Sequence, residues 1–175
     1  LPSAALPALV EALGDGSSTT GAQLEAAVRA RAVAAGEGRL AALQGQIDLH
    51  FSRPTLGDII TSLTGDDSDW ARHTLGALHK RSPLMMAVAL EQVRRARHLS
   101  LADDLRMERD LVRQCFQLRP GTASETVEGI RALVIDKDHQ PRWNPSRVED
   151  LTPDQVAAFF DSPWPAVVHP LRALD

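Results

Sequence analysis

Two side chains in the middle of the chain are of types that could do acid–base or nucleophilic chemistry. Glu108 falls within an apolar stripe of a helix that the spacing predicts over residues 101–116. A carboxylate on such a face either has a raised pKa, which suits catalysis, or forms an ion pair with a buried arginine. The ion pair is favoured, because structural pairs outnumber catalytic ones. Cys115 lies on the same stripe, and we expect it to be a small core residue rather than a nucleophile.

A charged cluster, formed by Asp136, Lys137 and Asp138, stands at the expected end of a helix over residues 126–137. One interpretation is a solvated helix end at which Lys137 complements the helix dipole. The other is that Lys137 binds a phosphate group of a ligand. Spacing alone favours the solvated helix end.

The usual catalytic and cofactor motifs are absent from the sequence, which has no G-x-S-x-G elbow, no phosphate loop, no H-E-x-x-H and no paired cysteines. His73 and His79 are six residues apart, so a helix would point them to different faces. No strand precedes the short glycine pairs at positions 14 and 16 or 36 and 38. We therefore expect neither a metal site nor a dinucleotide site in this chain.

Composition points to a helical, soluble protein. The 175 residues include 25 Ala and 23 Leu against 12 Val and 5 Ile, a balance that favours helix over strand. The net charge of -4 excludes a nucleic-acid binder that works by phosphate neutralisation. No apolar run is long enough to span a membrane, and the single cysteine is compatible with a reducing cytoplasm. We expect an all-α, cytoplasmic protein with no nucleic-acid or membrane partner.

Capping residues indicate where roughly eight helices begin. Thr20 and Thr55 each open a capping box, and Ser100 caps the helix that carries Glu108. The strongest boundary is Ser82 followed by Pro83, because proline favours the first position of a helix. The helix that opens at Thr20 is expected to continue to position 36, and residues 14–21 read as a mobile loop.

The stretch 128–145 reads E-G-I-R-A-L-V-I-D-K-D-H-Q-P-R-W-N-P. It resembles the run E-G-[VI]-R-A-x-[LV]-[IV]-D-K-D-x-x-P-x-W-x-P near the C-terminus of 3-hydroxyisobutyryl-CoA hydrolase-like proteins, a branch of the crotonase (enoyl-CoA hydratase/isomerase) superfamily. The resemblance extends over residues 82–160 and is weaker over residues 1–65. The family usually has an aspartate and a phenylalanine before this run, where this chain has Glu125 and Thr126.

The resemblance implies the helical C-terminal portion of a crotonase-type fold, without the N-terminal βα spiral core. That core carries the oxyanion-hole glycines and catalytic carboxylates of the family, so no catalytic residue is expected here. Residues 1–65 would follow the core, and residues 66–175 would form the C-terminal segment that carries the E-G-I-R motif. The first residue, Leu1, is not methionine, which also suggests a piece of a longer protein. Related crotonases have a basic residue just after the matching helix, which makes Lys137 the candidate contact for a CoA phosphate.

The activity that the resemblance implies for the longer protein is hydrolysis of a short 3-hydroxyacyl-CoA thioester, most simply 3-hydroxyisobutyryl-CoA. Two alternatives remain open: an enoyl-CoA hydratase/isomerase, and a non-catalytic helical interaction module. Acyl-CoA would be the substrate and the N-terminal crotonase core the partner. No separate cofactor is expected, because CoA is part of the substrate, and this chain alone should be inactive.

Self-association is a further expectation. Five apolar residues are more than a small helical cluster easily hides, and monomeric proteins seldom expose large continuous apolar patches. We therefore expect a homo-oligomer that buries Met85, Met86, Val88, Phe159 and Phe160.

Overall fold

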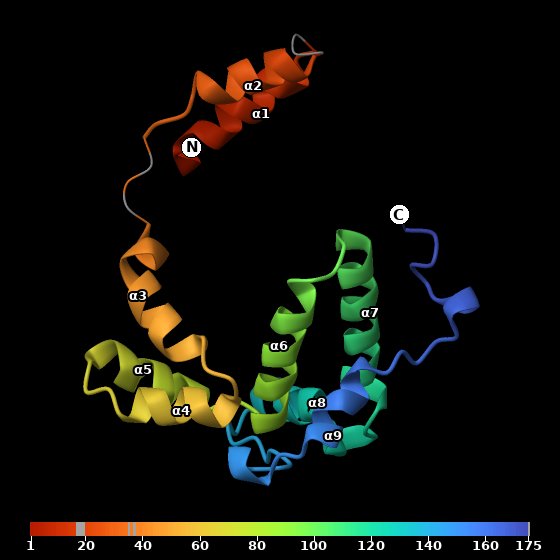
Figure 1. The fold of residues 1–175 in the computed structure, drawn as a ribbon. Helices are drawn as coiled ribbons and strands as arrows, with labels where there is room; N and C mark the ends of the chain where they lie inside the picture. The colour runs from red at the N-terminus through yellow and green to blue at the C-terminus, as the bar shows by residue number, and fades with distance from the viewer. Residues whose placement is uncertain (17–19, 35, 37, 175) are drawn as a thin grey trace. The chain divides into compact units, whose positions relative to one another are not determined.

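The computed structural model describes residues 1–16, 20–34, 36 and 38–174 of the chain. It divides into two compact units, Leu1–Leu49 and His50–Asp175, each of which is described by itself. The described residues form helices and connecting loops, with no strand among them, which confirms the all-α prediction (Figure 1). In this part of the chain no helix is both long and apolar enough to cross a membrane.

The first unit contains α1 (Leu6–Gly14), preceded by a short 3-10 turn, and α2 (Gly21–Arg29). The expected capping box is present, with the Thr20 hydroxyl accepting from the amide of Gln23. The prediction that this helix continues to position 36 was wrong, because α2 ends at Arg29. The Arg31 guanidinium donates to the carbonyl of Ala27, and such a bond satisfies a carbonyl that the end of the helix leaves free. Part of the predicted loop over residues 14–21 lies outside the described residues.

The helix α3 (Arg39–Phe51) ends in the second unit, where α4 (Leu56–Thr64) and α5 (Asp69–Leu78) pack against each other. Ile59, Leu63 and Ala71 are the buried residues between them. The helix α4 begins at the predicted cap Thr55, and α5 begins at the cap Ser68; the hydroxyl of each accepts the third amide of its helix. The predicted boundary between residues 1–65 and residues 66–175 falls between these two packed helices. That boundary stays a prediction.

Four segments build the second and larger core: α6 (Pro83–Ala96), α7 (Leu101–Gln117), α9 (Pro153–Ala157) and the 3-10 turn η5 (Ala158–Phe160). Leu84 and Val88 from α6 meet Leu111 and Phe159 there. Figure 1 shows α6 and α7 running in opposite directions; α9 contacts α6, and η5 contacts α7.

This core corrects the set of residues on which the self-association prediction was built. Val88 and Phe159 are buried within it, while Met85 and Phe160 are partly buried and pack against it. The error has a simple physical source: α9 and η5, which lie far along the chain, cover the apolar face of α6.

The helix α7 does not bury the face that its apolar stripe predicted. Leu111 and Cys115 pack in or against the core, as expected. Leu101, Leu105 and Phe116 are instead exposed. The helix is therefore apolar on two sides, and only one of them is covered within this unit.

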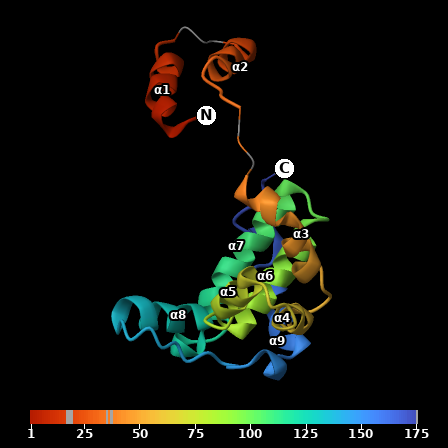
Figure 2. The ribbon, with the colours of Figure 1, turned by 90° about the vertical axis from the view of Figure 1, so that its left-hand side faces the viewer.

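The helix α8 (Glu125–Ile130) follows α7 and passes directly into a π-helix, η3 (Arg131–Ile135). Figure 2 shows this segment extending from the lower end of α7 and the chain returning as a long loop toward α9. Three short 3-10 turns, η2 (Gly121–Ala123), η4 (Val148–Asp150) and η6 (Ala166–Val168), complete the described chain.

Candidate functional site

The motif that carries the family resemblance folds around a buried carboxylate, Glu128. Its side chain accepts two hydrogen bonds from the Arg131 guanidinium, at 2.9 and 2.7 Å, and one from the Arg142 backbone amide at 2.7 Å. The bond to Arg142 joins α8 to the loop fourteen residues later. Hydrogen bonds from Arg131, then from the Arg142 amide, lower the pKa of Glu128 to about 2. Glu128 is thus ionised and fully engaged at neutral pH, which suits a structural role and not a general base.

Arg131 is the centre of this network. Its Nη1 atom lies 2.7 Å from a carboxylate oxygen of both Asp136 and Asp138, and its Nη2 atom donates to the carbonyl of Gln140. Three carboxylates around one guanidinium hold the pKa of Arg131 above its usual range. The pKa of Asp138 is lowered, first by Arg131 and then by the Gln140 amide. The two outer members of the predicted charged cluster are therefore joined through Arg131.

Lys137 lies between these two aspartates and is exposed, with a φ angle of 55°. The two carboxylates beside it are already paired with Arg131. Spacing favoured a simple solvated helix end at this position. The structure shows an ion-pair network at the end of a π-helix, and the lysine ammonium lies outside that network.

A second buried carboxylate, Glu125, holds the same loop to α6. Its Oε2 atom accepts a hydrogen bond from the Ser82 hydroxyl at 2.5 Å, and its Oε1 atom accepts one from the backbone amide of Asn144 at 2.9 Å. Ser82 also caps α6, because its hydroxyl accepts from the amide of Met85. The sequence marked Ser82 as a helix boundary, but it gave no sign that the residue would bind a glutamate 43 positions away.

Gly129 lets the loop lie close to α8. A Cβ atom at this position would be 3.3 Å from Cη2 of Trp143, tighter than most real contacts of a Cβ atom. The Glu-Gly, Arg and Trp residues of the motif therefore act together: they hold the loop 138–145 against α8.

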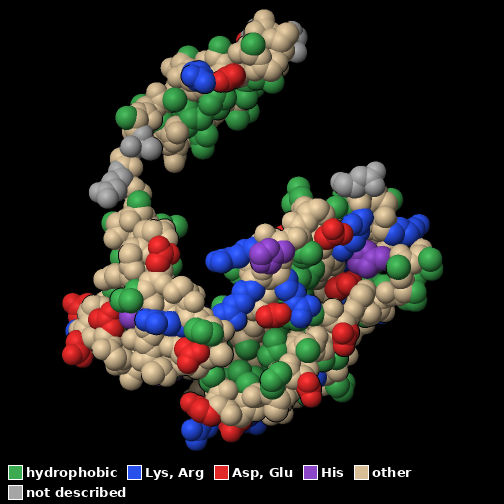
Figure 3. All heavy atoms as spheres, viewed as in Figure 1, with side chains coloured by type: hydrophobic (Ala, Val, Ile, Leu, Met, Phe, Trp, Pro, Cys, Tyr) green, Lys and Arg blue, Asp and Glu red, His purple; other side chains and the backbone are tan. Residues whose placement is uncertain are grey.

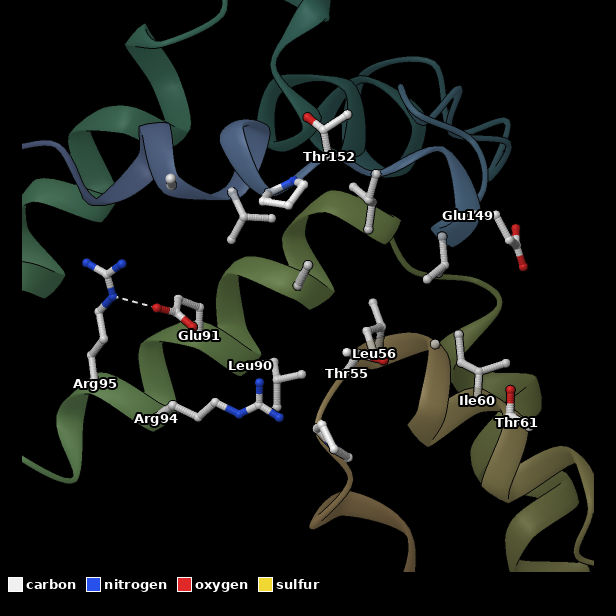
Figure 4. Close-up of a pocket in the computed structure, with 18 residues that line it drawn as sticks. Thr55, Leu56, Ile60, Thr61, Leu90, Glu91, Arg94, Arg95, Glu149 and Thr152 are labelled. Carbon is white, nitrogen blue, oxygen red and sulfur yellow. Dashed lines mark hydrogen bonds and ion pairs between the residues drawn. The ribbon is translucent and has the colours of Figure 1, made fainter.

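A groove of about 690 Å³ lies between the start of α4, the middle of α6 and the start of α9. Figure 4 shows Leu56, Ile60 and Leu90 lining it, with Arg94 and Arg95 at one end and Glu149 at the other. The groove is mostly apolar, with charges at its rim.

The basic end of this groove is partly occupied by intramolecular contacts. Arg94 donates to the carbonyl of Arg53 at 2.8 Å. Arg95 pairs with Glu91 at 2.7 Å, and its guanidinium lies 4.1 Å from the centroid of the Phe160 ring. Figure 3 shows basic side chains and a histidine gathered over this end of α6.

Two buried histidines carry hydrogen bonds that the sequence did not predict. The ring nitrogens of His50 lie 2.9 Å from the Ser62 hydroxyl and 2.9 Å from Asp66. Ser62 lies within α4. The backbone amides around it donate hydrogen bonds within the helix, so they do not form the oxyanion hole that a serine nucleophile would need. His169 lies 3.0 Å from Asp110 and fixes the C-terminal segment to α7. Both contacts connect segments that are distant in the sequence.

The remaining candidates from the sequence have structural positions. The expectation of a buried ion pair for Glu108 was wrong: its side chain is exposed and accepts from the Gln92 amide at 3.2 Å. The carboxylate that α7 does bury is Asp110, two residues further on. Cys115 is half-buried against the core, and burial raises the pKa of its thiol, as expected of a packing residue.

No group of three or more metal-ligating side chains is found among residues 1–16, 20–34, 36 and 38–174. Glu125 and Glu128 could in principle bind a cation, but amides, a hydroxyl and a guanidinium already occupy their oxygens.

These contacts define a class of structure: an all-helical unit in which two buried glutamates hold a tryptophan-containing loop in place. The chain matches the family model described as enoyl-CoA hydratase/isomerase over residues 1–160, and it belongs to that family. It is 35% identical over 119 residues to the "Probable 3-hydroxyisobutyryl-CoA hydrolase 3" of Arabidopsis thaliana, which is 66% of this chain and 31% of that relative. It is also 30% identical over 118 residues to the "Small ribosomal subunit protein mS47" of the same plant, 65% of this chain and 28% of that protein.

Among solved structures, the chain is similar to an enoyl-CoA hydratase from Rhodobacter sphaeroides 2.4.1. The TM-score is 0.75 at 32% identity, over 92% of this chain and 43% of that one. The chain thus spans about a third of the curated relatives and less than half of the solved neighbour. The fold is the helical portion of a crotonase-type fold, which confirms the fold and family that the motif predicted.

Proposed function

We propose that this chain is the C-terminal helical part of an acyl-CoA thioester hydrolase that acts on 3-hydroxyisobutyryl-CoA or a similar short 3-hydroxyacyl-CoA. The similarity to a relative named as such a hydrolase, over 119 residues at 35% identity, carries the proposal. The family match over residues 1–160 includes the whole network around Glu128, so the motif that suggested the family is also an intact structural feature.

The division of labour in this proposal follows from the buried carboxylates. Glu125 and Glu128 are each held by two or more donors, so neither is free to activate water. The thioester chemistry then belongs to the rest of the longer protein. There, two backbone amides would stabilise the oxyanion, and carboxylates would direct water to the carbonyl carbon. This chain would supply the helices that surround the acyl-CoA.

Lys137 is the residue that we propose for contact with a CoA phosphate. Support comes from its exposure and from the pairing of the neighbouring Asp136 and Asp138 with Arg131, which leaves the Lys137 ammonium outside the ion-pair network. In the assembled enzyme, Lys137→Ala is expected to raise KM for the acyl-CoA with little change in kcat. The same variant should leave KM unchanged for the acyl-pantetheine thioester, which has no nucleotide phosphates. Equal effects on both substrates would contradict this assignment.

The test of the activity is to produce this chain together with the remaining part of the Arabidopsis relative and to assay thiol release. Release of free CoA from 3-hydroxyisobutyryl-CoA, well above that of either part alone, is expected. Loss of an α,β-unsaturated acyl-CoA by hydration, without thiol release, would instead support a hydratase/isomerase. The solved neighbour named as an enoyl-CoA hydratase is the observation that keeps this second candidate.

A non-catalytic helical module is the third candidate, and the match to the small ribosomal subunit protein mS47 favours it. Failure of the assembled protein to turn over either substrate would support this candidate.

Three further properties belong to the same proposal. We propose a cytoplasmic location, which the single, half-buried Cys115 supports and which cell fractionation would test. We propose that no cofactor other than the CoA of the substrate is needed, so a dialysed, chelator-treated enzyme should retain its activity. We also propose that the chain self-associates, and the exposed residues Leu133, Val134 and Ile135 support this.

A further inference from the structure

The helix α7 has one apolar face that the described residues of its unit leave exposed. Leu101, Leu105, Val112 and Phe116 are spaced by four, seven and four residues, which places them on one side of a helix. Their relative exposures are 76%, 37%, 55% and 49%. We call these four residues the outer stripe of α7. Over their separation the stripe runs about 22 Å along the helix axis, at about 1.5 Å per residue.

A second side of α7 is already buried. Leu111 belongs to the core with Leu84, Val88 and Phe159, and Met107 and Leu118 pack against it. Gln114 donates to the carbonyl of Asp161 at 2.8 Å, which fixes η5 on this side. Together the two apolar sides are wider than the single side that a surface helix buries, which is typical of a helix that packs against more than one part of a larger protein.

The larger protein is indicated by the solved neighbour. These helices superpose with a TM-score of 0.75 on a chain of which they make up only 43%. More than half of that neighbour therefore lies outside the matched helices and has to pack against some of their faces.

We infer that the outer stripe of α7 is the surface that binds the remaining part of the enoyl-CoA hydratase/isomerase fold. The inference rests on the proposed function, because it takes this chain to be one part of a longer protein. The partner should present an apolar surface along the stripe. It should also present a cationic group opposite Glu108, because that carboxylate is exposed at one edge of the stripe and its only described contact is a neutral amide.

The test uses tagged capture. The remaining part of the Arabidopsis relative carries the tag and is produced together with the untagged 175-residue chain. We expect the wild-type chain to be recovered with the tag and Val112→Asp to be recovered at least about tenfold less. The matched control is Val93→Asp on α6, because Val93 is 56% exposed and Val112 is 55% exposed. It should be recovered like the wild type.

Both substitutions are at exposed positions, so both variants should keep the helical circular dichroism of the wild-type chain. Recovery of Val112→Asp at the wild-type level, or no recovery of the wild type, would overturn the inference. So would a stripe that serves only a second copy: Val112→Asp would then abolish self-association in light scattering but leave capture unchanged. Capture does not involve a thioester, so an assembled protein that is captured but inactive would contradict the proposed activity and not this surface.

Discussion

Replacement of Ser82 with alanine removes one hydroxyl that makes two contacts at the start of α6. That hydroxyl accepts the Met85 amide and donates to the buried carboxylate of Glu125. Loss of a helix N-cap costs about 1 kcal/mol. The carboxylate oxygen left without its donor adds about 1.5–3 kcal/mol, because a hydrogen bond to a charged group in a buried place is expensive to lose. The expected decrease in the free energy of unfolding is therefore about 2.5–4 kcal/mol.

Ser100 provides the matched control. Its hydroxyl also accepts the third amide of a helix and also donates to a carboxylate, that of Asp103. The difference is burial: Ser82 is 5% exposed, whereas Ser100 and Asp103 lie on the surface, where water replaces the lost donor. Ser100→Ala is expected to cost only the cap, about 1 kcal/mol.

Urea unfolding followed by tryptophan fluorescence measures both variants. All three tryptophans of the chain, Trp70, Trp143 and Trp164, lie in the unit His50–Asp175, so the signal reports that unit alone. With a slope of about 2 kcal/mol per molar urea, Ser82→Ala should lower the midpoint by about 1–2 M and Ser100→Ala by about 0.5 M.

Equal midpoints for the two variants would refute the buried contact. The coupling can also be measured directly: in a double-mutant cycle with Glu125→Leu, the effects of the two substitutions should be less than additive. Additive effects would mean that Ser82 acts as a cap and nothing more.

Other outcomes follow from the same structure. The low pKa of Glu128 means that its share of stability is complete above about pH 4.5 and is lost as the pH falls toward 2; Glu128→Gln should flatten that part of the pH profile of the urea midpoint, and an unchanged profile would contradict the network. Leu84→Ala, at a fully buried site, should cost about 2–5 kcal/mol, whereas Val93→Ala at an exposed one should cost less than about 0.5 kcal/mol; similar midpoints would show that Leu84 is not in the core. Cys115 should react with a thiol reagent at pH 7 far more slowly in the native chain than in urea, because burial raises its pKa; equal rates would place it on the surface. The purified chain alone should release no thiol from acyl-CoA, and clear turnover would contradict the proposed division of labour.

Local sequence chemistry determined where most helices begin. Thr20, Thr55, Ser82 and Ser100 each accept the amide three residues later, as the capping patterns predicted. These bonds lie within four residues of sequence, so neighbouring residues alone decide them. The all-helical class followed for the same reason, because an excess of alanine and leucine over β-branched residues acts locally.

The motif in residues 128–145 was enough to predict the family, but it did not predict the structural roles of its residues. Spacing predicted a solvated charged cluster around Lys137. The structure shows that Arg131 is the central residue, because it forms ion pairs with Glu128, Asp136 and Asp138. The turn that brings these carboxylates to one guanidinium includes a π-helix and positive φ angles, which periodicity does not predict.

Only the tertiary structure decided which faces are buried. Periodicity predicted one apolar stripe on α7 without distinguishing its members, whereas Leu111 is buried and Leu101 and Phe116 are exposed. It likewise placed Glu108 inside, where Asp110 is the buried carboxylate. Burial depends on which distant segments arrive, here η5 and the segment that carries His169, and these contacts join residues more than forty positions apart. A pattern of neighbouring residues describes the faces of a helix, whereas the packing of the whole chain selects the face that leaves water.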